Sequence, residues 1–266
     1  MLRARLATAA VAIPSLLALI LYPAAWPLAV FVSIIGLVGI GEYAAMAFPS
    51  RAAQRFLTII MGTVLLIGTA FPNGLHYLTA SLTLAVAVGL IWTLLTRSDF
   101  EHGLSDLGLS LVGIFYVGLF LPHFIWLHSI PVVGPLWVIF VILIGMAGDT
   151  GGYAVGHAIG RHKLMPRVSP GKTIEGAIGI IVASLLGGAV SKLIFLRQLT
   201  WGEAMLLAGT MAILGQLGDL SESIMKRTFG VKESGWLFPG HGGVLDRVDS
   251  LLFPVVFVYY YVIFIR

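Results

Sequence analysis

Long apolar stretches, separated by short breaks rich in proline, glycine or charge, constrain the fold of this chain more than any other feature. A helix needs about 20 mostly apolar residues to cross a bilayer. Nine stretches approach this length, at about 6–22, 27–48, 54–71, 76–96, 104–128, 131–158, 172–196, 202–226 and 248–265. Only 11% of the 266 residues are charged and 58% are hydrophobic, whereas soluble domains carry about 25% charged residues. We therefore predict an all-α polytopic integral membrane protein with about nine transmembrane helices.

These stretches leave no room for a soluble domain, so we predict a single membrane domain over residues 1–266. Within it we separate N-terminal helices, in residues 1–128, from a C-terminal catalytic region, in residues 129–266. Arg3 and Arg5 precede the first apolar stretch, as in a signal peptide. We interpret that stretch as a retained helix, because eight more spans follow it.

Lysine and arginine are distributed unevenly between the two sides that nine helices define. Thirteen of the 16 lie at the N-terminus or in every second loop, and the opposite side has Lys192, Arg197 and Arg266. Cytoplasmic loops of membrane proteins carry the excess of basic residues. We therefore predict a protein of the cytoplasmic (inner) membrane, with its N-terminus and its polar loops in the cytoplasm and its C-terminus outside.

Charge is concentrated in residues 219–249, which hold nine of the 28 charged residues. Ionisable groups at membrane depth are costly and are candidates for function. Asp149 and Asp219 both fall inside predicted helices. Glu222 lies four residues before Lys226, so an intrahelical ion pair and a functional role are equally compatible with its position.

A glycine-rich segment runs from Phe229 to Asp246. Glycine lets backbone N–H groups approach phosphate oxygens closely, which makes Gly242 and Gly243 candidates for phosphate binding. Asp246 and Asp249 are three residues apart at the start of a helix and share one face. The chain has no cysteine, and carboxylates without thiolates are typical ligands of a hard cation such as Mg²⁺. This combination indicates phosphoryl or nucleotidyl transfer at the membrane surface.

A second polar cluster occupies residues 169–176, Ser-Pro-Gly-Lys-Thr-Ile-Glu-Gly. We expect Ser169 or Thr173 to cap the following helix, and Lys172 to face an anion at the N-terminus of that helix. Glu42, near the end of the second stretch, we interpret as a structural partner rather than a ligand. Close helix packing is predicted by a four-residue glycine repeat, Gly148, Gly152, Gly156 and Gly160.

These polar segments resemble two motifs of the phosphatidate cytidylyltransferase (CDP-diacylglycerol synthase) family. Residues 169–176 resemble one of them, and Asp149 with Tyr153 matches the helix before it. Two positions depart from the family pattern, since Glu233 replaces a common aspartate and Gly171 a common lysine. The other motif spans about 27 positions and comprises Ser223-Ile224-Met225-Lys226-Arg227, Lys232 and Pro239-Gly240-His241-Gly242-Gly243-Val244-Leu245-Asp246-Arg247-Val248-Asp249.

The resemblance implies a phospholipid-biosynthetic transferase that converts CTP and phosphatidate to CDP-diacylglycerol and pyrophosphate, with Mg²⁺ as cofactor. It implies catalytic roles for Asp219, Lys226, Asp246 and Asp249. Metal binding would fall to Asp219 and Asp246, with Asp249 and Asp149 as further candidates. The substrate-binding residues would be Ser169, Lys172, Thr173, Glu175, Ser223, Arg227, His241, Gly242, Gly243 and Arg247.

Two other functions are compatible with the sequence. One is a CTP-dependent enzyme that acts on another lipid phosphate or on a polyprenol. The other is a cation-coupled transporter with Asp149 and Asp219 as cation sites, although the polar groups gather on one side and no inverted repeat is apparent. We expect CTP, phosphatidate and membrane lipid as partners, and no nucleic acid. The glycine-rich faces and the resemblance favour a homodimer.

Overall fold

The computed structural model describes residues 13–70, 74–96, 100–237 and 242–266. Within these ranges, eight helical segments are long and apolar enough to cross a membrane. The prediction of an all-α integral membrane protein is therefore confirmed. The predicted first span, residues 6–22, lies partly outside the described residues, and its described part is helical from residue 13 to residue 20.

An N-terminal bundle is formed by four helices that pack on one another: α2 (Trp26–Ala47), α3 (Ala52–Ala70), α4 (Gly74–Thr96) and α5 (Phe100–Gly118). The short helix α6 (His123–His128) follows. We predicted one continuous helix over 104–128, and the structure divides it at residues 119–122. Pro122 supplies the reason, because proline lacks the N–H that continues a helix and fits best at a helix start.

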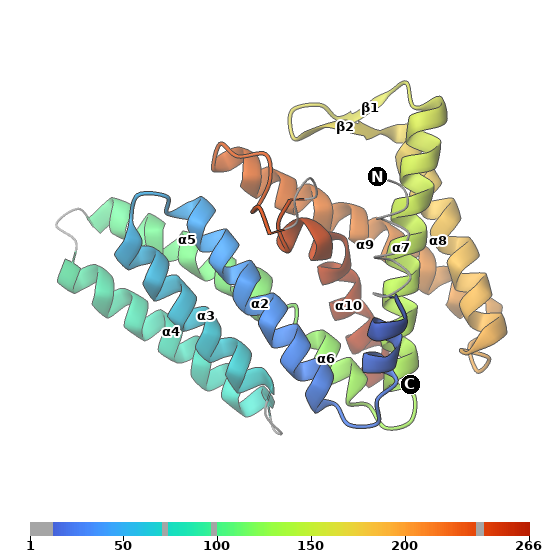
Figure 1. The fold of residues 1–266 in the computed structure, drawn as a ribbon, viewed down its shortest axis with the longest axis horizontal. Coiled ribbons are helices and arrows are strands. Elements are labelled where there is room, and N and C mark those ends of the chain that lie inside the picture. Colours follow the sequence, from blue (N-terminus) through green and yellow to red (C-terminus); the bar gives the residue numbers. More distant parts are fainter. Residues whose placement is uncertain (1–12, 71–73, 97–99, 238–241) are drawn as a thin grey trace.

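A C-terminal bundle is formed by the remaining long helices: α7 (Gly134–Ile159), α8 (Ile174–Ile194), α9 (Trp201–Thr228) and α10 (Leu245–Ile265). Figure 1 shows α10 between the N-terminal bundle and α7. A large apolar core, which includes Trp137 and Phe140 of α7, joins side chains of α2, α6, α7, α9 and α10. A smaller core lies among α3, α4 and α5. The two bundles are thus joined through α2, α6 and α10.

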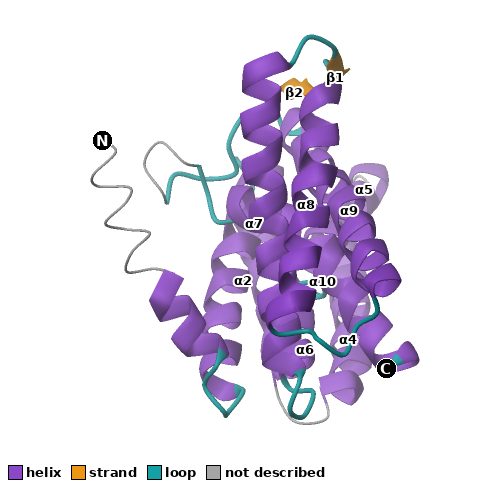
Figure 2. Ribbon diagram, turned by 90° about the vertical axis from the view of Figure 1, so that its right-hand side faces the viewer, coloured by secondary structure: helices purple, strands orange, loops and turns teal. Residues whose placement is uncertain are grey.

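A short β-hairpin projects from the end of the C-terminal bundle (Figures 1 and 2). It consists of β1 (Lys163–Met165) and β2 (Ser169–Thr173), which pair in an antiparallel manner. These strands were not singled out from the sequence. Three- and five-residue strands are too short to carry a clear alternation of apolar and polar residues, which is why the sequence pattern does not reveal them.

Helices α7 and α8 pack with their backbones in close approach. A Cβ added at Gly151 would lie 2.7 Å from the carbonyl oxygen of Gly179, and one added at Gly152 would lie 2.5 Å from Ile180 Cγ1. A Cβ at Gly156 would lie 3.3 Å from Thr173 Oγ1. The glycine repeat therefore serves helix packing, as predicted.

Candidate active site

Two adjoining cavities lie where the C-terminal bundle meets the hairpin and the segment before α10. The first, of about 460 Å³, is bounded by α7, β2, α8 and α9. The second, of about 320 Å³, is bounded by α7, α9, α10 and the segment that connects α9 to α10. Asp149 of α7 and Asp219 of α9 line both cavities. The structure therefore brings the two intramembrane aspartates singled out in the sequence to one shared wall.

Carboxylates outnumber cations around the second cavity. Its described lining contains two cationic side chains, Lys226 and Arg247, and five carboxylates, those of Asp149, Asp219, Glu233, Asp246 and Asp249. Such an excess of negative charge attracts cations to the cavity.

The hairpin brings a lysine to the shared wall. Lys172, on β2, places its Nζ 2.6 Å from Oδ2 of Asp219. Its neighbour Thr173 caps α8, because the Thr173 hydroxyl accepts a hydrogen bond from the Gly176 N–H at 3.1 Å. The cap fixes the start of α8, and thereby the direction in which β2 presents Lys172. Of the two caps that we considered, Thr173 is the one that forms.

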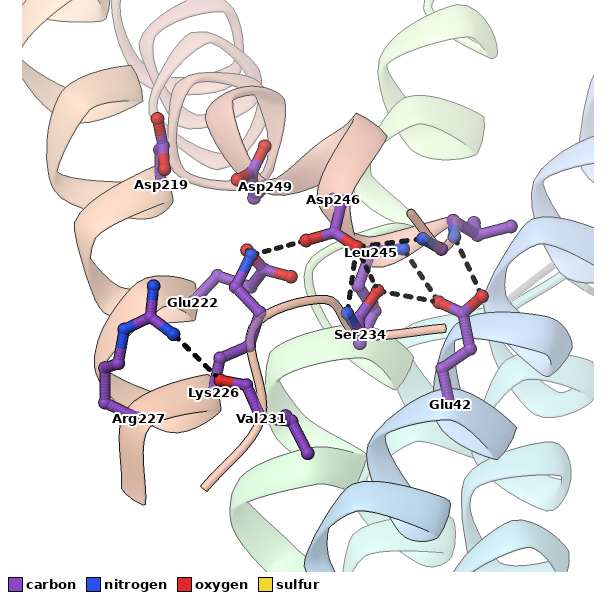
Figure 3. Close-up of polar contacts among 12 residues, drawn as sticks. Glu42, Asp219, Glu222, Lys226, Arg227, Val231, Ser234, Leu245, Asp246 and Asp249 are labelled. Carbon is purple, nitrogen blue, oxygen red and sulfur yellow. Dashed lines mark hydrogen bonds and ion pairs between the residues drawn. The ribbon is translucent and has the colours of Figure 1, made fainter. Parts of the chain in front are cut away.

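Lys226 joins two helices at the second cavity (Figure 3). Its ammonium group forms an ion pair with Glu222, one turn earlier on α9, and another with Asp246 on α10. Glu222 is completely buried. Of the two roles that its position allowed, the intrahelical ion pair with Lys226 is the one observed. A buried charge needs such pairing to be tolerated.

Asp246 is the most heavily bonded carboxylate of the site. Its Oδ1 faces Lys226, and its Oδ2 accepts hydrogen bonds from the Ser234 N–H at 2.9 Å, the Ser234 hydroxyl at 2.8 Å and the Gly243 N–H at 2.8 Å. Gly242 has a φ of 77°, and a Cβ there would overlap Oδ2 of Asp246. The glycines accordingly let this protein carboxylate approach the backbone, and phosphate binding by Gly242 and Gly243 stays a prediction.

Glu42 of α2 completes the connection between the two bundles. Its carboxylate accepts hydrogen bonds from the Val244 N–H at 2.9 Å and the Leu245 N–H at 3.0 Å. The Ser234 hydroxyl lies 3.2 Å from Oε2 of the same carboxylate (Figure 3). Glu42 is therefore a structural partner, as interpreted from the sequence. Ser234 was not singled out, and no local pattern around it would have revealed its role.

Several predicted substrate-binding residues lie outside the linings of these two cavities. Ser169 pairs with Met165 in the hairpin, and Glu175 accepts hydrogen bonds from the N–H groups of Arg161 and His162 at 3.1 and 3.2 Å. Arg227 donates to the Val168 carbonyl at 3.1 Å and to the Val231 carbonyl at 3.0 Å. Ser223 is buried on α9. His241 lies outside the described residues.

The donor set suits a hard cation, since aspartate oxygens line the shared wall. Among the described residues, no three carboxylate or imidazole groups are placed so that they could hold a metal ion by themselves. Mg²⁺ is commonly bound by one or two carboxylates together with water and substrate phosphates, so the arrangement fits this ion. Each of the four aspartates already has a protein contact, since Lys172 faces Asp219 and Ser250 donates to Asp149 and to Asp249. Asp246 has the largest number of protein donors among the contacts of the described residues, so the other three are the better placed candidates.

A larger cavity, of about 740 Å³, lies elsewhere, between α2, α3 and α6. Its lining includes Trp26, Leu66 and Trp126 and contains no charged side chain. Of these three cavities, the two smaller ones therefore contain the charged groups that could bind a phosphate or a cation.

Sequence comparison with known proteins finds a matching family and related proteins. A model of the cytidylyltransferase family matches residues 3–265. A protein of Bacillus subtilis (strain 168) named phosphatidate cytidylyltransferase is 35% identical over 176 residues, which are 66% of this chain and 65% of that relative. Proteins of the same name in Staphylococcus saprophyticus and Staphylococcus aureus (strain COL) are 38% and 39% identical over 164 and 166 residues, each match covering 62% of this chain and 61% of the relative. The chain thus spans about 61–65% of the length of these relatives.

Proposed function

The chain belongs to the cytidylyltransferase family, and from this membership we propose that it transfers the cytidylyl group of CTP to phosphatidate. The products would be CDP-diacylglycerol and pyrophosphate. The observation that carries the proposal is the shared wall, because Asp149 and Asp219 separate two cavities that each contain a cationic side chain. Two phosphate-bearing substrates that react with each other must be held side by side, and the adjoining cavities each offer a cationic side chain for a phosphate.

In the proposed reaction, an oxygen of the phosphatidate phosphate attacks the α-phosphorus of CTP. The new P–O bond forms as the bond from the α-phosphorus to the bridging oxygen of the β-phosphate breaks, and pyrophosphate leaves with that electron pair. The nucleophile is already an anion near neutral pH, so the protein has no need to remove a proton from it. Positioning of the two phosphates and stabilisation of their charge would supply most of the catalysis.

The cations of the two cavities would divide this work. Lys172 lines the first cavity, and Lys226 and Arg247 line the second. Lys172 and Lys226 would each replace part of their present carboxylate pairing with a phosphate contact when substrate binds, and Arg247 would add a further phosphate contact. Charge-assisted hydrogen bonds of this kind are stronger than neutral ones and hold a phosphate in a fixed orientation.

Of the ligands predicted from the sequence, Asp219 and Asp246 with Asp249 and Asp149 as further candidates, one or two would hold Mg²⁺ together with water and substrate phosphates. When bound, the ion would neutralise negative charge on the phosphates. The carboxylate excess of the second cavity supports this proposal, because free CTP would otherwise be repelled from it.

We place the protein in the cytoplasmic membrane with the hairpin and the α9–α10 segment on the cytoplasmic side. The distribution of basic residues supports this orientation. CTP would then enter from the cytoplasm, and phosphatidate would enter from the bilayer between helices. A homodimer remains our expectation and can be tested by cross-linking in native membranes.

The decisive experiment supplies the purified protein with CTP labelled at the α-phosphate, phosphatidate and Mg²⁺. We expect label in CDP-diacylglycerol and release of an equal amount of pyrophosphate. Label in lipid from γ-labelled CTP would instead identify a kinase. Failure to form a nucleotide-linked lipid with phosphatidate or any other lipid phosphate would refute the proposed transfer.

A further inference from the structure

The N-terminus of α10 is capped by a residue from another helix. The first N–H groups of a helix have no partner within it and need one elsewhere. Val244, which precedes α10, provides no side-chain cap. The carboxylate of Glu42, on α2, accepts the Val244 and Leu245 N–H groups instead, at 2.9 and 3.0 Å.

The same carboxylate is linked to the site through one serine. The Ser234 hydroxyl lies 2.8 Å from Oδ2 of Asp246 and 3.2 Å from Oε2 of Glu42. A hydroxyl has one hydrogen to donate, so it serves one of the two carboxylates at a time. The Ser234 N–H also donates to Asp246, at 2.9 Å. Glu42 thus contacts Ser234, which donates to Asp246, and also the start of α10, the helix that carries Asp246.

The backbone at Gly235 and at Gly243 lies close to the Glu42 carboxylate. A Cβ added at Gly235 would lie close to the Glu42 side chain, 2.8 Å from its Cδ, and one added at Gly243 would overlap Glu42 Oε2. Glycines at both positions allow the segment to enclose the carboxylate. Glu42 itself lines neither of the two candidate cavities.

We infer that Glu42 is a positioning residue for the transfer reaction, acting through Ser234 and the start of α10 on Asp246. The inference rests on the proposed function and extends it to the N-terminal bundle. By fixing Ser234 and the α10 N-terminus, Glu42 keeps Oδ2 of Asp246 on its protein donors and Oδ1 on Lys226. A residue that orients the site without contacting substrate should alter kcat more than KM.

The test compares Glu42→Gln, Glu42→Ala and Glu42→Asp in the full chain, purified in detergent. Glutamine keeps the size of the side chain but replaces one acceptor oxygen with an NH₂ group that would face N–H donors. Aspartate keeps the charge and shortens the reach by one methylene. The matched control is Asp106→Asn, which alters a carboxylate of the N-terminal bundle that pairs with Arg51, far in sequence from the α10 segment.

We expect Glu42→Gln to lower kcat about 10- to 100-fold, because small displacements of catalytic groups cost this much, with both KM values within about twofold of wild type. Glu42→Asp should fall between wild type and Glu42→Gln. Hydrogen exchange at the Val244 and Leu245 amides should quicken in the Glu42 variants and stay unchanged in Asp106→Asn.

Wild-type turnover in the same assay separates failure of this inference from failure of the proposed function. If wild type forms no CDP-lipid, the transfer proposal fails, while hydrogen exchange still tests the contact. Wild-type kcat in Glu42→Gln would overturn the inference. Unchanged exchange at the two amides, or a kcat loss matched by Asp106→Asn, would overturn it as well.

Discussion

The N-terminal and C-terminal bundles are similarly apolar but use their polar side chains in opposite ways. Mean hydropathy is 1.5–2.0 for the spans of the first bundle and 1.3–2.0 for those of the second. In the N-terminal bundle, polar groups of α3 and of Arg51, the residue before it, bind polar groups of α5. Gln54 donates to Ser110 at 2.9 Å, Thr58 and Ser110 are 2.9 Å apart, and Arg51 pairs with Asp106.

In the C-terminal bundle, by contrast, the polar groups surround open space. Five carboxylates and two cations line the second cavity, and Asp149 and Asp219 extend that lining into the first. The comparison teaches that a charge in a membrane helix stabilises the fold where it is matched by a neighbouring helix. It is a candidate for function where carboxylates outnumber cations around a cavity.

The largest effect expected within this comparison comes from Asp246→Asn. We expect turnover to fall by at least about 100-fold, because the amide can satisfy neither Lys226 nor all three donors that now face the carboxylate. Steady-state assay of CDP-lipid formation measures the loss. Ser234→Ala, which removes one of these donors, should lose about tenfold. Near-normal turnover of Asp246→Asn would remove this residue from the site.

Lys172→Gln should have the next largest effect. Lys172 faces Asp219 in a cavity, whereas Lys192, at the other end of α8, donates to the Arg197 carbonyl at 3.4 Å. We expect kcat/KM to fall about 10- to 100-fold for Lys172→Gln, since a charged hydrogen bond to phosphate is lost. Lys192→Gln is the matched control and should stay near wild type. Equal losses in the two variants would show that the position of the lysine is irrelevant.

A pair of glycine substitutions, one in each bundle, tests the close packing of α7 and α8. A Cβ at Gly151 would meet the Gly179 carbonyl oxygen at 2.7 Å, whereas one at Gly41, on α2, would meet nothing within 4 Å. We expect Gly151→Ala to lower the free energy of unfolding by about 1–3 kcal/mol. Gly41→Ala should leave it unchanged or raise it by up to about 1 kcal/mol. Thermal unfolding in detergent checks both, and equal midpoints would contradict close packing of α7 and α8.

Arg266→Ala should have the smallest effect, although it lies next to the C-terminal bundle. Arg266 pairs with Glu203 at 2.5 Å, and both side chains are about a third exposed. Exposed ion pairs contribute little, so we expect unchanged turnover and an unfolding midpoint within about 1 °C of wild type. A large loss of turnover here would mean that the bundle as a whole, rather than its cavities, is sensitive to charge.

Much of the architecture could be predicted because membrane spans are encoded locally. Twenty apolar residues identify a helix wherever it packs, and the glycine repeat of α7 identifies a close neighbour. The four-residue spacing of Glu222 and Lys226 on one helix likewise predicted their ion pair as one of two possible roles for Glu222. The hairpin was missed because strands as short as β1 carry too few residues to show a period.

The contacts that complete the candidate site could not be predicted, because they join distant parts of the chain. Glu42 and Leu245 are 203 positions apart, and neither neighbourhood indicates the other. Ser234 looks like an ordinary loop residue until Glu42 and Asp246 are seen on either side of its hydroxyl. Glycines near Asp246 were interpreted as a phosphate cradle, and that stays a prediction; what the sequence did not indicate is that the Gly243 and Val244 N–H groups face carboxylates of the protein itself.

The most direct test of the account is one experiment on two aspartates, Asp219→Asn in the cavity wall and Asp106→Asn in the N-terminal bundle. Turnover of CTP with phosphatidate and thermal unfolding are measured on the same preparations. We predict that Asp219→Asn loses at least about 100-fold in kcat with an unfolding midpoint near wild type. Asp106→Asn should keep the kcat of wild type and unfold several degrees lower, since Arg51 loses its negatively charged partner. Normal turnover in Asp219→Asn, or a comparable loss of kcat in Asp106→Asn, would contradict the account.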